Sequence, residues 1–107
     1  MALQTAVLQG GVALSTGSTT LYTVPTAKSA WVKRAVFTNT TGAPIAIAVA
    51  ISRAGGAGLA IISSQALAAG TAYVSPELSG LALNAGDAIL ASATAIGINA
   101  FISGLTA

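Results

Sequence analysis

The heptapeptide IAIAVAI, residues 45 to 51, alternates branched aliphatic residues with alanine at a strict period of two. Successive side chains of a β-strand point to opposite faces, so the branched residues share one face and the alanines share the other. Alanine favours helix, but the β-branched residues between the alanines favour a strand. The segment therefore predicts a strand whose branched face lies in the core. Its uncharged alanine face would pack closely on another sheet or meet another subunit.

Short segments rich in Val, Ile, Thr and aromatic residues recur along the rest of the chain, separated by glycine-containing turns. Clear examples are residues 18 to 25, 28 to 40, 87 to 94 and 98 to 104. No sustained helical periodicity is present. This pattern predicts an all-β fold, an antiparallel β-sandwich of jelly-roll or Greek-key type with about eight strands.

The length of 107 residues fits one domain, residues 1 to 107, in which residues 1 to 17 form either an extra strand or an arm that reaches a neighbour. Charged residues make up only 6% of the chain, against about a quarter in an ordinary soluble domain. The whole charged set is Lys28, Lys33, Arg34, Arg53, Glu77 and Asp87. Such a surface predicts a subunit that is largely covered by its neighbours.

The residue inventory argues against catalysis and metal binding. The chain has no His and no Cys, which excludes the usual triads and the His or Cys metal sites. Glu77 and Asp87 are the only acids, and nothing in the sequence brings them together. The glycine-rich loop RAGGAG, residues 53 to 58, lacks the lysine and hydroxyl residue of a phosphate-binding loop. We expect no enzymatic activity, no metal and no cofactor.

Nucleic-acid and membrane partners are also not expected. Lys33 and Arg34 are adjacent, so on a strand they would point to opposite faces and form no basic stripe. The most apolar stretch, residues 45 to 62, is interrupted by Arg53 and by glycines, whereas a spanning helix needs about 20 uninterrupted apolar residues. Two strands joined by a glycine loop fit this stretch better.

Two turns share one sequence frame. LAAGTAY, residues 67 to 73, and LNAGDAI, residues 83 to 89, both place a glycine before a short oxygen-bearing residue. We expect Gly70 and Gly86 to supply the turn conformation and Asp87 to hydrogen-bond nearby amides, as a structural turn residue and not as a catalytic acid. Thr71 holds the matching place, so the position is expected to need an oxygen but no charge. Replacing Asp87 with Asn would then be nearly harmless.

The segments LYTVPTAKSAWVKRAVFTNTTGAP, LAAGTAY, LNAGDAILASAT and INAFISG, in this order, resemble a family of small virion proteins of tailed bacteriophages. The shared features are a Leu-Tyr-x-Val-Pro turn, a long strand that begins with Lys and runs into an Asn-Thr-x-Gly turn, and the two glycine turns. The resemblance implies a β-sandwich without enzymatic activity that serves as capsid decoration or cement, or as a tail or fibre component. This chain is poorer in charge and richer in alanine than the family pattern.

From these features we expect a capsid cement or decoration protein on the capsid surface of the virion. It would be a homotrimer that binds the major capsid protein through symmetric contacts. The residues expected to make subunit or capsid contacts are Leu3, Val7, Leu8 and Arg53. The alternative is a tail-tip or fibre module that binds a host receptor or glycan, for which Trp31 and Tyr73 would form a sugar-stacking platform. The sequence favours instead a Trp31 that caps the core or lies in an interface.

Overall fold

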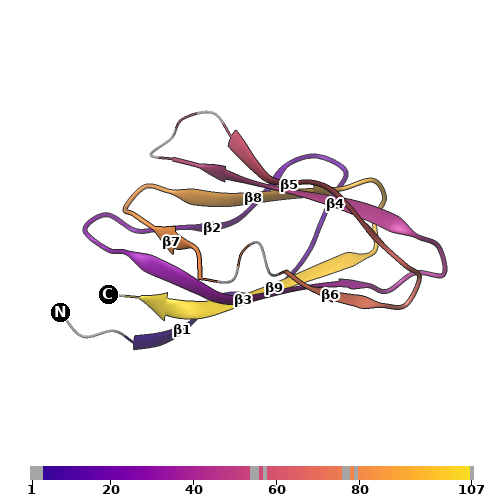
Figure 1. Ribbon diagram of the computed structural model, residues 1–107, viewed down its shortest axis with the longest axis horizontal. Coiled ribbons are helices and arrows are strands. Elements are labelled where there is room, and N and C mark those ends of the chain that lie inside the picture. Colours follow the sequence, from indigo (N-terminus) through magenta and orange to yellow (C-terminus); the bar gives the residue numbers. More distant parts are fainter. Residues whose placement is uncertain (1–3, 54–55, 57, 76–77, 79, 107) are drawn as a thin grey trace.

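The computed structural model describes residues 4 to 53, 56, 58 to 75, 78 and 80 to 106. These residues form strands, turns and irregular segments and contain no helix. The strands pair antiparallel in two sheets that lie face to face (Figure 1). Their bounds are β1 Gln4–Ala13, β2 Thr19–Thr23, β3 Ala30–Asn39, β4 Ile45–Ser52, β5 Gly58–Leu67, β6 Ala72–Val74, β7 Ala82–Leu83, β8 Ala88–Ala93 and β9 Ile98–Thr106.

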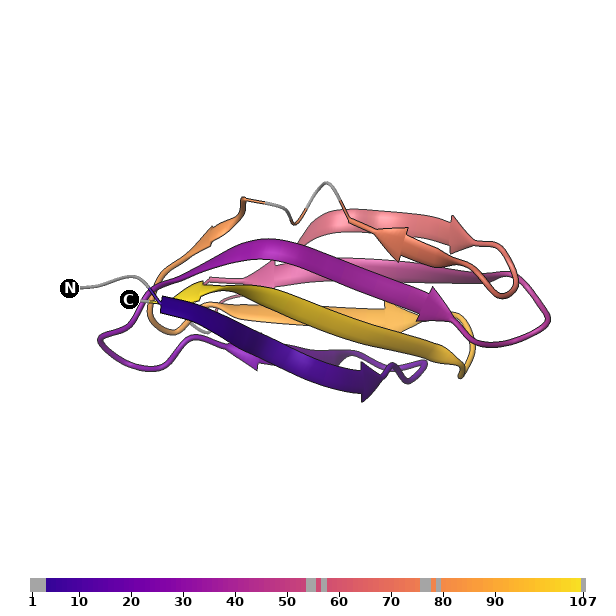
Figure 2. The same ribbon diagram turned by 90° about the horizontal axis from the view of Figure 1, so that it is seen from below.

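Sheet A has the strand order β1-β9-β3-β6, and β7 also pairs with β3; sheet B has the order β2-β8-β4-β5. β6 pairs with the C-terminal part of β3 and β7 with its first two residues, so the two short strands share one strand position. The chain passes from sheet to sheet in the manner of a jelly roll with eight strand positions. Figure 2 views the molecule from the side of sheet A, with β1, β9 and β3 side by side. The predicted all-β sandwich is confirmed.

The alternation in β4 sets which side chains enter the core. Ile45, Ile47, Val49 and Ile51 are all buried between the sheets, and the alanines of this strand are half-buried on the outer face of sheet B. Buried side chains from sheet A, including fully buried Phe37, face them. The period of two read from the sequence therefore predicted the core face of the central strand correctly.

A β-bulge in β3 changes the alternation of this strand. Its register to β9 shifts between Val32 and Arg34. Val32 and Ala35 are both buried, while Lys33 and Arg34 between them are both exposed. The expectation that the two basic residues point to opposite faces was wrong, because the extra residue of a bulge lets two neighbours remain in solvent.

The close approach of β9 to β3 depends on Gly104, which pairs with Val32. A Cβ atom at this position would collide with the carbonyl oxygen of Trp31 and crowd the side chain of Leu8 from β1. Only glycine fits here without a shift of the backbone. The absence of a side chain at Gly104 therefore allows β9 to lie close to β3 and to Leu8 of β1.

Candidate interaction surfaces

The described part of the chain contains no cluster of acidic or metal-ligating side chains that could hold a metal ion. Every buried polar side-chain atom in the described residues has a hydrogen-bond partner. Glu77 lies outside the described residues, so its expected separation from Asp87 stays a prediction. None of the described segments is a helix long and apolar enough to cross a membrane. The candidate functional sites are therefore the outer surfaces of the two sheets.

Asp87 is buried and forms an ion pair with Arg53, with 2.6 Å between Oδ2 and Nη1. The same Oδ2 accepts a hydrogen bond from the backbone N–H of Asn84 at 2.9 Å. Arg53 also donates to the carbonyl oxygen of Ala82 at 3.3 Å, and β7, which contains Ala82, belongs to sheet A. Arg53, in the β4–β5 loop of sheet B, therefore ties the two sheets together at one end of the sandwich.

The turn before β8 and the turn before β6 have the same backbone design. The N–H of Asp87 donates to the carbonyl of Asn84, and the N–H of Thr71 donates to that of Ala68. The glycine preceding the last residue of each turn has a positive φ, 85° at Gly86 and 69° at Gly70. The side chains differ in what they do. The Thr71 hydroxyl donates to a carbonyl within its own turn, whereas the Asp87 carboxylate accepts and carries a paired charge.

Asn39 is a second buried polar residue, and the sequence reading did not single it out. Its Nδ2 donates to the carbonyl oxygens of Ala43 and Leu67 at 2.8 and 3.1 Å, and its Oδ1 accepts from the N–H and hydroxyl of Thr41. These bonds join the end of β3 to the β3–β4 turn and to the end of β5. Asn39 thus connects the sheets near the start of β4, and Arg53 does so beyond its end. The Asn-Thr-x-Gly turn that follows the strand was the available sequence signal.

The other expected contact residues are placed as follows. Leu8 is buried in the core, where it packs beside Gly104, so its side chain is used within the fold and is not offered to a neighbour. The backbone of Val7 lies in β1 and pairs with Ser103 of β9. Leu3 lies outside the described residues. Residues 4 to 13 form an edge strand of sheet A.

Trp31 and Tyr73 lie on opposite faces of sheet A. Tyr73 pairs with buried Phe37 and packs against the core. Trp31 is flanked in β3 by the buried residues Ala30 and Val32, so it points outward. The two aromatic side chains therefore form no common platform, and the less favoured sugar-stacking alternative for this pair does not hold.

The outer face of sheet A carries a row of apolar residues across its strands. Val36 pairs with Phe101 on one side and with Val74 on the other. The side chains of Phe101 and Val74 are exposed, at 42% and 48%. The Phe101 ring lies over Gly11 of β1, where a Cβ atom would come within 2.8 Å of it. The ring therefore lies against the backbone of β1 while much of its surface stays exposed.

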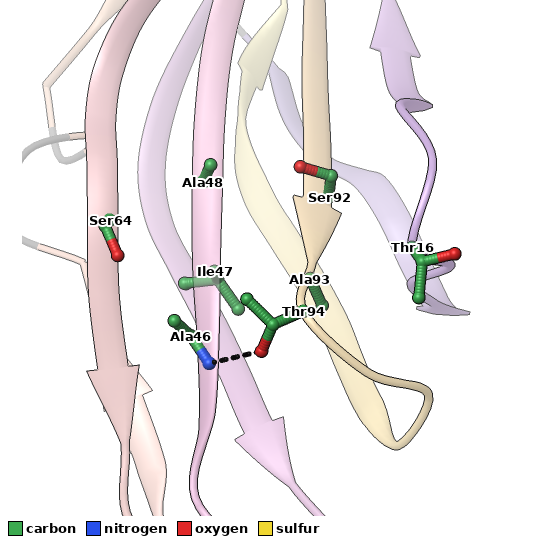
Figure 3. Close-up of a pocket in the computed structure, with 8 residues that line it drawn as sticks. All are labelled: Thr16, Ala46, Ile47, Ala48, Ser64, Ser92, Ala93 and Thr94. Atoms are coloured by element: carbon green, nitrogen blue, oxygen red, sulfur yellow. Dashed lines mark hydrogen bonds between the residues drawn. The ribbon is translucent and has the colours of Figure 1, made fainter.

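The outer face of sheet B is different, because it is made of small, uncharged residues. Two adjoining hollows of about 360 Å³ each lie on it, and Ala48 and Ser92, which pair across β4 and β8, line both. Figure 3 shows one of them, with Ser64 on one side and Thr16 on the other and Ala48 and Ser92 between them. The N–H of Ala46 donates to the Thr94 hydroxyl at its lower end, at 3.1 Å.

No protein-family model matches the sequence, and no curated protein matches it either. In fold, the chain is similar to a chain in the structure of infectious bursal disease virus Gx strain, with a TM-score of 0.58 and 11% identity over 98% of this chain and 31% of that chain. A chain in the crystal structure of the T13 viral particle of the same virus gives a TM-score of 0.51 and 10% identity, over 98% and 30%.

The chain thus spans about a third of the length of these two viral chains. At such low identity the likeness shows the fold, which is the jelly-roll sandwich described above. Both neighbours belong to infectious bursal disease virus, which is not a tailed bacteriophage.

Proposed function

We propose that this chain is a non-enzymatic structural protein of a bacteriophage virion, a capsid cement or decoration protein. It sits on the capsid surface, binds the major capsid protein and stabilises the shell through symmetric contacts between copies, as a homotrimer. The observation that carries the proposal is a jelly roll in which one whole sheet has no charged residue. Jelly rolls are common in viral capsid proteins, and the structural neighbours of this chain come from virus particles.

The size of the surface supports a role that depends on contacts. The chain exposes 5330 Å², close to the value of about 5,400 Å² expected for a folded monomer of its mass. The chain has only four basic and two acidic residues. Its surface is therefore of ordinary size but carries few charges. Of these, Asp87 is buried against Arg53. Soluble monomers keep their copies apart by interspersed surface charge, which this chain largely lacks.

The outer face of sheet A supplies the contact with the capsid in this proposal. Its apolar row, Phe101, Val36 and Val74, lies in the same sheet as the exposed basic residues Lys33 and Arg34. An apolar anchor with basic neighbours fits a partner that has an apolar pocket and acidic residues around it.

A second copy of this chain offers few carboxylates for such a contact. One of its two acidic residues is engaged with Arg53. The occupant of this face is therefore a different protein, for which the major capsid protein is our proposal. Contacts of modest affinity suffice, because the symmetry of the shell repeats each one many times and the repetition adds avidity.

The test is to measure the mass of the purified protein by light scattering and then to sediment it with undecorated capsids. Co-sedimentation of a trimer at a fixed ratio to the capsid protein is the expected result. Binding to cells or glycans without binding to capsids would overturn the proposal in favour of a tail-tip or fibre module. An array of immobilised glycans, tested with the same preparation, separates the two outcomes.

A further inference from the structure

We propose that the outer face of sheet B is a self-association surface whose occupant is a second copy of this chain. The face consists of the outward residues of all four strands of sheet B, in the order β2, β8, β4 and β5, with Ala48 and Ser92 near its centre. The inference deepens the proposed function, on which it rests for the presence of symmetric neighbours, by naming the surface that joins the copies.

The strands that form this face contain no charged residue. None of the residues in β2, β4, β5 and β8 is Asp, Glu, Lys or Arg, whereas β3 of sheet A carries two basic residues. The outward residues of β4 are three alanines and Ser52. An isolated sheet in water normally presents polar or charged side chains on its solvent face. This face has the composition of a covered surface.

The shape of the face favours close packing. Leu90 is its one bulky aliphatic residue in β8, and it pairs with Ala50 of β4. Its Cδ1 reaches across to Gly58 of β5, lying 3.8 Å from where a Cβ atom would stand. The leucine therefore lies across two small residues and does not project as a long side chain would. The hollows beside it leave room for side chains from another surface.

The area is sufficient for a specific contact. An eight-residue strand such as β4 is about 26 Å long, and four strands are about 19 Å wide, so the face covers about 500 Å². Two such surfaces in contact bury about 1,000 Å², which is the lower limit for a specific protein interface.

A second copy is the occupant that fits this face best. A charged partner surface would have to be desolvated against the face without gaining any ion pair. A second copy can present the same uncharged sheet or another part of its charge-poor surface. If the face meets its own equivalent the assembly is two-fold, and if it meets another patch the assembly closes as a ring such as the trimer.

The test uses Ala48→Glu, which places a carboxylate at the centre of the face, and Ala72→Glu, which makes the same change at an exposed alanine of sheet A. Sedimentation velocity over a range of concentrations measures the association of each. We expect the unmodified chain to associate, Ala48→Glu to weaken association at least tenfold, and Ala72→Glu to leave it unchanged. Circular dichroism melting shows whether each variant is folded.

Ser92→Lys serves as a second probe if Ala48→Glu fails to fold, because a lysine on the half-buried neighbouring position can extend into solvent. A folded variant that keeps the full association of the unmodified chain would overturn the inference, as would an unmodified chain that remains monomeric. The experiments distinguish a failure of the capsid role from a failure of the self-association. Association through this face without capsid binding would disprove the capsid role alone, and a monomer that binds capsids would disprove the self-association alone.

Discussion

Arg53 and Asp87 meet through a 2.6 Å contact although 34 positions separate them in the sequence. The Arg53 side chain is 45% exposed and that of Asp87 only 4%, so the arginine contacts solvent whereas the carboxylate is shielded from it. Because Asp87 also accepts the Asn84 N–H, its carboxylate has partners from both the β4–β5 loop and its own turn at the point where the chain enters β8. The charge of Asp87 therefore has a partner that the sequence alone did not reveal.

The ion pair changes the expectation for Asp87→Asn. The amide retains an acceptor for the Asn84 N–H but loses the charge that faces Arg53, and we expect a loss of about 1 kcal/mol in the free energy of unfolding. Asp87→Ala also leaves the N–H without its acceptor, and we expect a loss of about 2–3 kcal/mol. Urea unfolding measures both losses without adding salt. A double-mutant cycle with Arg53→Met measures the coupling energy between the two side chains. A coupling energy of zero would show that Asp87 serves only as a turn residue and that its charge does not contribute to stability.

Asn39→Asp should destabilise the fold strongly. The new carboxylate oxygen would face the carbonyl oxygens of Ala43 and Leu67 in a buried site, where the amide now donates to both. We expect a loss of about 3 kcal/mol or more. Asn99→Asp, on the outer face of β9, is the matched control and should change stability by less than about 0.5 kcal/mol. Thermal melting of the two variants side by side decides the matter, and equal losses would contradict the role given to Asn39.

Gly104→Ala tests the close approach of β9 to β3. The added methyl group would meet the backbone of Trp31, which cannot move without breaking the pairing of the strands. We expect a loss of about 1–3 kcal/mol, the usual cost of overpacking. Gly42→Ala is the control, because nothing lies within 4 Å of its would-be Cβ atom. Stability unaffected by Gly104→Ala would show that the strands can separate slightly at no cost.

Phe101→Ser should weaken co-sedimentation with capsids at least tenfold, which is about 1.4 kcal/mol of binding free energy. The reason is that Phe101 is the exposed anchor of the apolar row on sheet A. Ile96→Ser removes an even more exposed apolar side chain in the β8–β9 turn, outside that row, and should leave capsid binding unchanged. If both variants bind equally well, the capsid contact lies elsewhere on the molecule.

Tyr22 gives a pH-dependent prediction. Burial raises the pKa of the Tyr22 hydroxyl above its ordinary value of 10.0, so the folded chain holds this proton more tightly than the unfolded chain. The stability that this provides is complete below pH 10 and is lost as the pH rises through the pKa of the folded state. Tyr22→Phe should therefore lose less stability than the unmodified chain between pH 8 and about 11. Urea midpoints that fall equally in both chains would contradict this.

The strands were predictable because their signal is local. The alternation of β4 and the glycine turns at Gly70 and Gly86 depend on residues close together in the chain. The bulge at Lys33 was missed, because two adjacent charged residues in a strand look like simple alternation until the partner strand fixes the register.

The ion pair and the opposite placement of Trp31 and Tyr73 were missed for a different reason. Both depend on which strands become neighbours, and a single sequence contains no such information. Arg53 was expected to contact a neighbouring chain, yet its guanidinium is already engaged within the fold. The alternation in β4 alone predicts a neutral alanine face, but the extent of that face over a whole sheet depends on the strand order β2-β8-β4-β5, which the sequence does not specify.

The absence of charge from sheet B has a consequence for durability. An assembly joined through this face would have no ion pairs for salt to screen. It would also have no carboxylate cluster that binds calcium, so a chelator would have no calcium to remove from the interface. The chain also has no His, whose protonation near pH 6 dismantles many interfaces, and no Cys for a reductant to attack. Such a contact would withstand changes of acidity, ionic strength and redox state, and would respond chiefly to agents that solvate apolar and peptide groups, such as urea.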